Sequence, residues 1–233
     1  MEIYSVLILT HRDSNGIPLL PHFEWLLKYN PDVDVHIIVG EDSMKGKEYN
    51  WKNGDMPLRN WWKINNNKII HDKILIIEWD TLVACKIPEF PKEYDLASKW
   101  HFEENVSNRG RWKKKRMIDP NWTPDNWWWW PEIPKLKLKD NQRAVGLVSL
   151  GCFFCRKWVL DVVCKKEWDY LYEDSIISEM RFPTIAHNEG AKIGAIDLPY
   201  VSYQKISLSK YEGIYHAVKQ SFEGEFKKPT LVQ

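Results

Sequence analysis

Apolar runs and helix-like spacing alternate along the first third of the chain. The runs SVLIL at 5–9, VDVHIIV at 33–39 and DKILII at 72–77 each predict a buried strand. Between them, residues 22–29 and 56–65 carry apolar positions at helical spacing. A succession of strand, helix, strand, helix and strand favours parallel pairing with right-handed crossovers. The pattern therefore predicts an α/β protein built on a mainly parallel sheet.

Regular patterning returns after an interruption. The later predicted elements are strand structure over 144–155, helices over 156–164 and 175–181, and a last strand over 192–196. Residues 98–142 show no clear periodicity, and we expect them to form a long irregular insertion, since long loops in compact domains are usually functional or disordered. We expect one domain over 1–233, with a polar C-terminal tail over 208–233.

Polar side chains follow the predicted strands. Thr10 follows the first strand, Asp42 follows the second, and Glu78-Trp79-Asp80 follows the third. In parallel sheets, ligands gather at the carboxyl ends of the strands. Two carboxylates at such an end can hold Mg²⁺ or Mn²⁺, which prefer few protein carboxylates plus phosphate oxygens. A strand that ends in a solvated acidic turn is the alternative.

Two later stretches carry further candidate groups. In YEDSIISEMRF, Glu173 and Asp174 stand at a predicted helix start, where carboxylates favour the helix dipole. A carboxylate beside a pocket could instead act as a general base. In YEGIYHAVK, His216 precedes Lys219 by three residues, and a lysine there could supply a positive charge to a phosphate. A lone histidine is more often a surface or core residue than a ligand, so these features are informative only in combination.

Charge and cysteine content argue against a nucleic-acid-binding protein and against a redox or zinc protein. The net charge of +1 gives no global bias toward nucleic acid, although 109–116 reads RGRWKKKR. The four cysteines are Cys85, Cys152, Cys155 and Cys164; the CxxC pair lies in an apolar stretch without a second pair at metal spacing. We therefore expect buried structural thiols rather than a redox or zinc site. The first residues lack the pattern of a signal peptide, and a reducing, cytoplasmic setting is expected.

In combination, the motifs resemble those of nucleotide-sugar glycosyltransferases of the GT-A fold, family 2-like or related. LRNWWKINNNKIIHDKILIIEWDT, residues 58–81, is similar to that family's "a-R-N-x-(G/A)" stretch leading to D-x-D, with Glu78-Trp79-Asp80 in the D-x-D place. Glutamate for the first aspartate is a departure that keeps an oxygen ligand. GCFFCRKWVLDVV and YEDSIISEMRFPTIAHNEG are similar to the "g-x-f-x-f-x-R-x-v-l" and "E-D-x-x-l-x-x-R…G" segments. The resemblance covers residues 3 to 219, apart from 98–142, and implies a Rossmann-like, mixed and mainly parallel sheet flanked by helices.

The resemblance also implies roles by position. It would place Thr10 and Asp42 near the nucleoside, Arg59 near the base or diphosphate, and Lys219 on the diphosphate. Glu78 and Asp80 would hold Mn²⁺ or Mg²⁺, with His216 as a third metal ligand from the tail. Asp174 would deprotonate the acceptor hydroxyl in an inverting enzyme, with Glu173 and Glu179 as the other candidates.

Four consecutive tryptophans, Trp127, Trp128, Trp129 and Trp130, interrupt the insertion in the stretch DNWWWWP. Neither a helix nor a half-buried strand buries four indoles in a row. An indole offers a rigid face for sugar C–H groups and an N–H for a hydroxyl, so the cluster could form the acceptor site. Two alternatives are packing of the insertion onto the domain and contact with a bilayer, where residues 109–116 would attract anionic headgroups.

We therefore expect a metal-dependent hexosyl- or pentosyltransferase that moves a sugar from a nucleoside-diphosphate donor, in the first instance UDP-linked, to a glycan or glycolipid, as in polysaccharide biosynthesis. No nucleic acid partner is expected, and peripheral membrane contact through 109–116 stays open. One alternative is a sugar-phosphate nucleotidyltransferase, although residues 10–17 contain only Gly16 where such enzymes carry a glycine-rich loop. The other is a non-catalytic carbohydrate-binding protein built on the tryptophans.

Overall fold

A six-stranded sheet forms the centre of the computed structural model, which describes residues 4–40, 53–104, 112–116, 135–148, 151–173, 176–196, 200–202 and 212–218. The strands, in the order β10-β5-β9-β3-β1-β2, are β10 (Ile193–Ala195), β5 (Leu96–Ser98), β9 (Cys152–Arg156), β3 (Lys73–Glu78), β1 (Ser5–Thr10) and β2 (Asp34–Val39). β1 pairs in parallel with both β2 and β3, and β10 is parallel to β5. β9 is antiparallel to both of its neighbours. The predicted mixed, mainly parallel sheet is confirmed.

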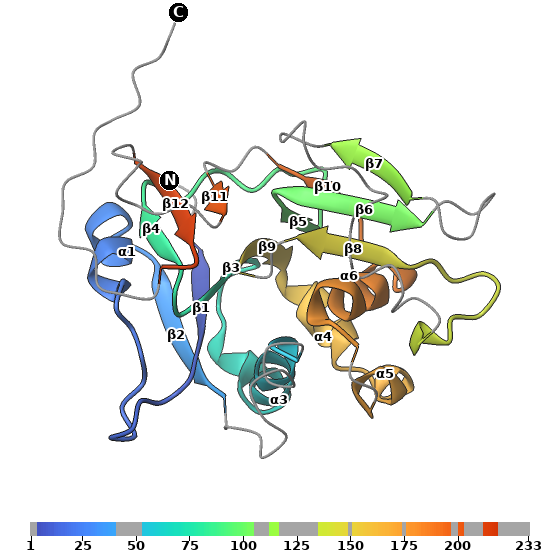
Figure 1. The fold of residues 1–233 in the computed structure, drawn as a ribbon, viewed down its shortest axis with the longest axis horizontal. Helices are drawn as coiled ribbons and strands as arrows, with labels where there is room; N and C mark the ends of the chain where they lie inside the picture. The colour runs from blue at the N-terminus through green and yellow to red at the C-terminus, as the bar shows by residue number, and fades with distance from the viewer. Residues whose placement is uncertain are drawn as a thin grey trace, which may run out of the picture.

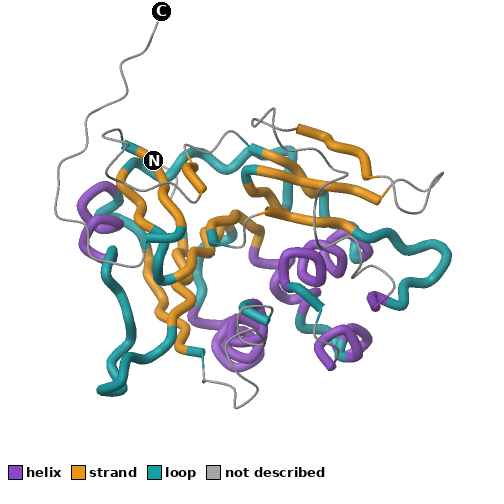
Figure 2. Tube along the Cα trace, viewed as in Figure 1, coloured by secondary structure: helices purple, strands orange, loops and turns teal. Residues whose placement is uncertain are grey.

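Helices flank this sheet. They are α1 (Phe23–Tyr29), α3 (Asp55–Asn65), α4 (Lys157–Val163), α5 (Tyr170–Glu173) and α6 (Ser178–Asn188), with short 3-10 turns η1 (Asn66–Lys68) and η4 (Lys166–Trp168). In the view of Figure 1, α3, α4, α5 and α6 gather below the strands, and α1 lies at the left flank. Figure 2 shows the same grouping of helices in purple against strands in orange. The helices predicted over 22–29, 56–65 and 156–164 match α1, α3 and α4 within a residue or so.

Burial explains why the apolar runs become these strands. Ile74, Leu75, Ile76 and Ile77 of β3 are all buried, as expected for an interior strand covered on both faces. β2, at the edge of the sheet, is mostly half-buried, and Ile37 is exposed. The core is therefore centred on β1, β3 and β9, and the carboxyl end of β3 emerges from it.

A small second sheet brings a late segment back to the end of β3. It has the order β11-β12-β4, formed by β11 (Tyr200–Ser202), β12 (Gly213–His216) and β4 (Leu82–Ala84). β12 runs antiparallel to β4, with Tyr215 opposite Leu82. Since β4 begins two residues after Asp80, this register sets the end of β12 beside the carboxylates that follow β3.

The insertion over 98–142 is not wholly irregular, and that prediction is wrong in part. β6 (Trp100–Glu104) and β7 (Trp112–Arg116) pair antiparallel, and β8 (Val145–Val148) pairs with the other edge of β6. The register sets Glu103 opposite Lys113 and Glu104 opposite Trp112. Residues 112–116 of the basic run therefore belong to a strand, whereas the four tryptophans lie outside the described residues.

The helix predicted over 175–181 also differs. α6 begins at Ser178 and continues to Asn188, and Glu173 is the last residue of α5. Residues Ile176 and Ile177 are buried between the two helices, and the extended backbone of Ile177 starts α6 there. The prediction that Glu173 opens a helix is therefore wrong, whereas Asp174 lies outside the described residues.

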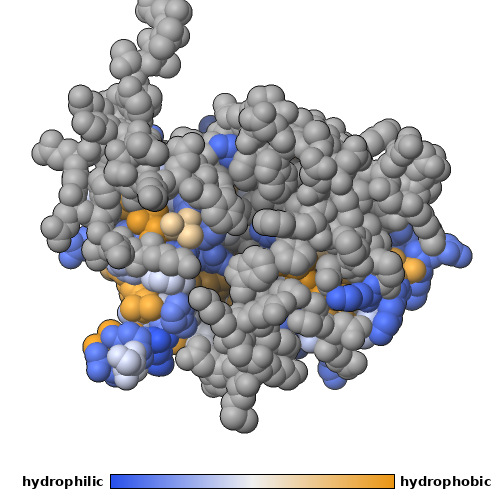
Figure 3. Space-filling model, in the orientation of Figure 1, coloured by the Kyte–Doolittle hydropathy of each residue, from blue (hydrophilic) through white to orange (hydrophobic). Residues whose placement is uncertain are grey.

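The described surface has few large apolar side chains. The exposed ones are Ile17, Ile37, Ile64 and Ile70. On the described parts of the face drawn in Figure 3, hydrophilic residues prevail at the projecting loops and hydrophobic ones show in smaller patches between them. Within the described ranges, every helix is too short or too polar to cross a bilayer.

Candidate functional site

The end of β3 directs two carboxylates to one place. Glu78 is the last residue of β3, and the backbone N–H of Trp79 still donates to the carbonyl of Leu9 at 2.8 Å, so the turn stays attached to β1. The N–H of Thr81 then donates to the carbonyl of Glu78 at 2.9 Å and closes a tight turn. Asp80 is buried within that turn and Glu78 is half-buried. Both carboxylates therefore lie at the carboxyl edge of the parallel strands.

His216, the last residue of β12, completes a triad with these carboxylates. Its Nε2 lies 2.9 Å from Oε2 of Glu78 and 3.2 Å from Oδ1 of Asp80. The three side chains offer one ligand atom each, and these atoms lie within 4.8 Å of one another. The structure thus brings together the three residues that the sequence motifs proposed as metal ligands.

Two residues that the sequence did not single out support the triad. The hydroxyl of Thr81 donates to the carbonyl of Gly151 at 2.7 Å, and the N–H of Glu78 donates to the same carbonyl at 3.2 Å. Gly151 directly precedes β9, so these bonds fasten the acidic turn to the neighbouring strand. A glycine directly before an apolar run, in the stretch GCFFC, is the visible sequence signal of this contact.

The triad combines one histidine with two carboxylates, so its positive and negative charges do not balance. Burial lowers the pKa of His216, but the close contacts of the ring with Asp80 and Glu78 and the negative charge of these carboxylates raise it overall to about 10. At neutral pH an imidazolium therefore faces two carboxylates. Oδ1 of Asp80 is buried and accepts no well-formed hydrogen bond from the described residues, since the single N–H of Nε2 is directed to Glu78.

These donors fit a divalent cation. Two carboxylates and one imidazole, converging at a buried oxygen that lacks a full hydrogen bond, can exchange the proton on His216 for a metal ion. Carboxylate oxygens suit Mg²⁺, Ca²⁺ and Mn²⁺, and an imidazole nitrogen shifts the preference toward a transition metal. The set therefore favours Mn²⁺ among the oxygen-preferring ions.

The polar groups of Thr10 and Arg59 bond to residues other than the triad. The hydroxyl of Thr10 donates to the carbonyl of Leu19 at 2.7 Å. Nε of Arg59 donates to the carbonyl of Val163 at 3.1 Å, and its guanidinium also pairs with Asp169. Both side chains are thus engaged within the protein, and a donor-binding role for either stays a prediction.

The remaining predicted site residues fall mostly outside the described part of the chain. Those outside it are Asp42, Asp174, Lys219, Trp127, Trp128, Trp129 and Trp130. Glu173 is described only as the end of α5, and Glu179 lies in the first turn of α6. Their roles in catalysis, donor binding and acceptor binding stay predictions.

A buried arginine fixes the segment that leads to Asp174. Arg181 of α6 is fully buried and pairs through its guanidinium with Asp55 of α3. The same guanidinium donates to the carbonyls of Leu171 at 3.3 Å and Ile176 at 3.1 Å. The ring of Tyr172 lies between Arg181 and Arg59, with guanidinium carbons 4.3 and 4.2 Å from its centroid. Both ends of the stretch 171–176 are therefore held by one side chain.

Burial keeps the cysteine thiols protonated and therefore unreactive. Cys85, Cys152 and Cys155 are buried, all four thiols are free, and burial raises the pKa of Cys85 to about 12. Cys164 is partly buried, and burial raises its pKa to about 11. Cys152 and Cys155 are three residues apart in β9 and so point to opposite faces of the sheet. The expectation of buried thiols is confirmed for three of the four.

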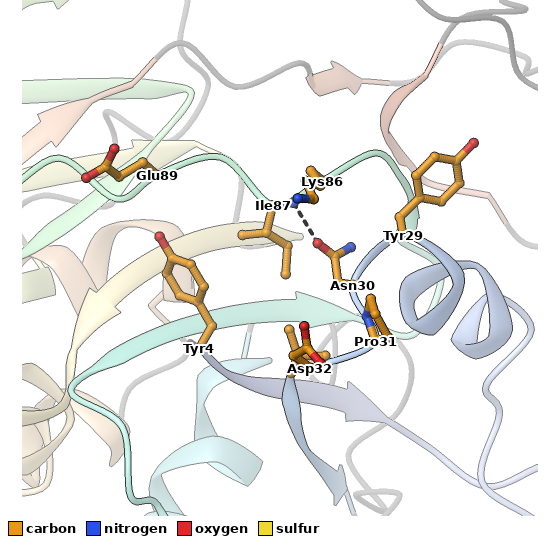
Figure 4. A pocket seen from close by; sticks show the side chains of 9 residues that line it. Tyr4, Tyr29, Asn30, Pro31, Asp32, Lys86, Ile87 and Glu89 are labelled. Atoms are coloured by element: carbon orange, nitrogen blue, oxygen red, sulfur yellow. Dashed lines mark hydrogen bonds between the residues drawn. The ribbon is translucent and has the colours of Figure 1, made fainter. Parts of the chain in front are cut away.

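A cavity among the described residues lies away from the triad. A cavity of about 520 Å³ is lined by Tyr4, Tyr29, Asn30, Pro31, Asp32, Val33, Lys86, Ile87 and Glu89, as Figure 4 shows. It opens at the amino ends of β1 and β2, at the opposite edge of the sheet from the triad. The amide of Asn30 is already used by the N–H of Ile87 at 2.8 Å and by the carbonyl of Cys85. The side chains that could bind a ligand together converge at the triad and not in this cavity.

Comparison with known proteins gives remote structural similarity only. Galactosyltransferase LgtC, solved with donor and acceptor sugar analogs, is similar with a TM-score of 0.45 at 10% identity, covering 91% of this chain and 86% of that one. Mouse xyloside xylosyltransferase 1 in its apo form has a TM-score of 0.44 at 10% identity, covering 96% and 100%. The inositol-1-phosphate CTP transferase from T. maritima has a TM-score of 0.38 at 13% identity, covering 82% and 84%. Similarity at this level assigns no activity to this chain.

No protein-family model matches the chain, and no curated protein matches its sequence.

Proposed function

We propose that the protein is a metal-dependent glycosyltransferase that moves a sugar from a nucleoside diphosphate, in the first instance UDP, to a glycan or glycolipid hydroxyl. The observation that carries this proposal is the convergence of Glu78, Asp80 and His216 at the carboxyl edge of parallel strands. Ligands of open α/β sheets bind at that edge. The Glu78-Trp79-Asp80 motif and its resemblance to D-x-D support a diphosphate as the group bound there.

The proposed chemistry of donor activation needs positive charge beside the leaving phosphate. Departure of a sugar from a nucleoside diphosphate builds negative charge on the leaving phosphate, and a cation held by Glu78, Asp80 and His216 would stabilise it. Lys219 follows Val218 directly in sequence and is proposed to add a second positive charge. The acidic turn is fastened to β1 and to Gly151, so the carboxylates are held in position before a ligand arrives.

The acceptor side of the reaction rests on residues outside the described ranges. Asp174 is proposed as the base that draws the proton from the acceptor hydroxyl, and Trp127 to Trp130 as the surface on which the acceptor stacks. Support for Asp174 comes from the E-D motif and from the anchoring of its flanks, since Arg181 holds the carbonyls of Leu171 and Ile176.

Substitution of Asp174 by asparagine tests the base. The change keeps the size of the side chain and removes its charge, so donor binding is expected to persist while transfer falls roughly 10²-fold. Single-turnover transfer and donor affinity, measured on the same preparation, separate the two effects. Near-normal transfer by this variant would move the role to Glu173 or Glu179, or indicate a retaining mechanism.

A thermal-shift screen of nucleotide sugars, with and without Mn²⁺, tests the function as a whole. A donor that binds the folded state raises the melting temperature by mass action, and the rise is expected to require Mn²⁺. Product analysis then identifies the reaction class. A glycosyltransferase releases a nucleoside diphosphate, a sugar-phosphate nucleotidyltransferase releases pyrophosphate from a nucleoside triphosphate, and a binding protein releases neither. Stabilisation by sugars alone, without nucleotide or metal, would overturn the proposal.

A further inference from the structure

The third ligand of the triad depends on backbone contacts beyond the triad itself. His216 belongs to the segment 212–218, which reaches the site from far along the chain. The N–H of Val218 donates to the backbone carbonyl of Asp80 at 2.7 Å, and the carbonyl of Val218 accepts from Nε2 of His22, also at 2.7 Å. The backbone two residues after His216 is therefore clamped between the acidic turn and the start of α1.

His22 is suited to the role of a fixed donor. It directly precedes α1 and is 3% exposed. A carbonyl oxygen only accepts, so Nε2 of His22 carries the proton in this contact. Burial lowers the pKa of His22, against the opposing effects of the bond to Val218 and the charge of Asp80, so the neutral ring prevails at neutral pH. The bond to Val218 is thus one between neutral groups inside the protein.

Gly151 constrains the imidazole from the other side. A Cβ built on Gly151 would lie 2.7 Å from Cε1, Nδ1 and Nε2 of His216, closer than the 3.0 Å that real Cβ atoms respect. The backbone of Gly151 cannot easily withdraw, because its carbonyl accepts bonds from Thr81 and Glu78. Its φ lies outside the left-handed region, so the glycine is needed here for space and not for backbone conformation.

We propose that His22 and Gly151 are positioning residues that hold His216 as a preformed third ligand of the metal site: Gly151 leaves room for the ring, and His22 anchors the backbone that follows it. The effect on metal binding rests on the proposed function, whereas the effect on the segment 212–218 does not.

Substitution of Gly151 by alanine tests the space beneath the ring. The added methyl group displaces the imidazole, and the Kd for Mn²⁺ is expected to rise about 10- to 100-fold, as for loss of groups that orient metal ligands. Gly194→Ala is the matched control. A Cβ on Gly194 would lie 2.3 Å from the ring of Tyr94, a clash of the same kind in β10 at the far edge of the sheet. The control is expected to lower the melting temperature and leave the Kd for Mn²⁺ unchanged. Equal Kd values for wild type and Gly151→Ala would overturn the role of Gly151.

A pair of substitutions at His22 tests the anchor. Leucine fills a similar volume without a donor, whereas glutamine can present an N–H at a similar reach. In His22→Leu we expect faster hydrogen exchange at the Val218 amide and a Kd for Mn²⁺ raised about tenfold or more, and in His22→Gln we expect both to return most of the way to wild type. Equal exchange rates in wild type and His22→Leu would overturn the role of His22.

The two readouts also separate the possible failures. A wild-type protein that binds no Mn²⁺ would overturn the proposed function, and the exchange experiment, which is done without metal, would still test the clamp. If the wild type binds Mn²⁺ and both His22→Leu and Gly151→Ala have the same Kd for Mn²⁺ as the wild type, the positioning role is overturned. The proposed function would then still stand.

Discussion

Replacing Asp80 with asparagine is expected to raise the Kd for Mn²⁺ at least about 100-fold and to remove metal-dependent turnover. Loss of a residue that merely supports a ligand costs roughly 10- to 100-fold in metal affinity, so loss of a direct ligand should exceed that range. Asp80 offers the buried oxygen that lacks a full hydrogen bond, and it lies within the turn that the Thr81 N–H and the Glu78 carbonyl close. Asparagine keeps the shape of the side chain, so the fold should survive.

The measurement is Mn²⁺ binding followed by water-proton relaxation, with circular dichroism to confirm the fold. Asp32→Asn is the control, because Asp32 is an exposed carboxylate at the amino end of β2, at the other edge of the sheet. Glu78→Gln is expected to cost less than Asp80→Asn, since Glu78 is the more exposed of the two ligands. Wild-type turnover by Asp80→Asn at saturating Mn²⁺ would contradict the metal site.

Replacing Arg181 with methionine is expected to lower the free energy of unfolding by about 3–5 kcal/mol, which is the usual cost of breaking a buried ion pair from one side. The guanidinium and the carboxylate of Asp55 are both almost completely buried, so methionine would leave an uncompensated charge in the core. Two backbone carbonyls, those of Leu171 and Ile176, would lose their donor as well. A loss of this size is a large fraction of the total stability of a typical domain.

Urea denaturation at pH 7 measures this loss. Lys165→Met is the control, because Lys165 pairs with Glu189 at the surface and its side chain is 43% exposed; an exposed pair contributes only about 0–1 kcal/mol. In the double variant Arg181→Met/Asp55→Leu the buried charge is gone on both sides, and much of the stability should return. A loss below about 1 kcal/mol in Arg181→Met would show that the pair does not hold the two helices together.

The sequence predicted the central strands well because their signal is local. A continuous apolar run such as ILII in β3 has few stable alternatives to a strand buried on both faces. The last strand, predicted over 192–196, matches β10, whereas β4 and β5 have three residues each, too few to produce a measurable period. The antiparallel direction of β9 was equally hidden, since direction is decided by where the connecting segments run and not by residues within the strand.

The residues of the site also fall into those that the sequence could predict and those that it could not. Glu78 and Asp80 are two residues apart after one strand, so their proximity could be predicted from the sequence, and His216 could be added only through a family resemblance. Gly151 and His22 could not be found, because their importance depends on a ring and a carbonyl that tertiary structure brings to them. A glycine before a strand and a histidine before a helix have many ordinary explanations until the neighbouring residues are known.

The distance along the chain between the ligands affects how the protein matures. His216 lies 138 residues after Glu78, and β12 lies between β11 and β4 in the small sheet. At translation rates of about 5–20 residues per second, roughly 7 to 28 seconds separate synthesis of the acidic turn from synthesis of the histidine. During that interval β1, β2 and β3 can pair while the two carboxylates have no third ligand. A nascent chain is therefore expected to acquire its sheet first and its tight affinity for metal last, so that an ion cannot template the early steps of folding.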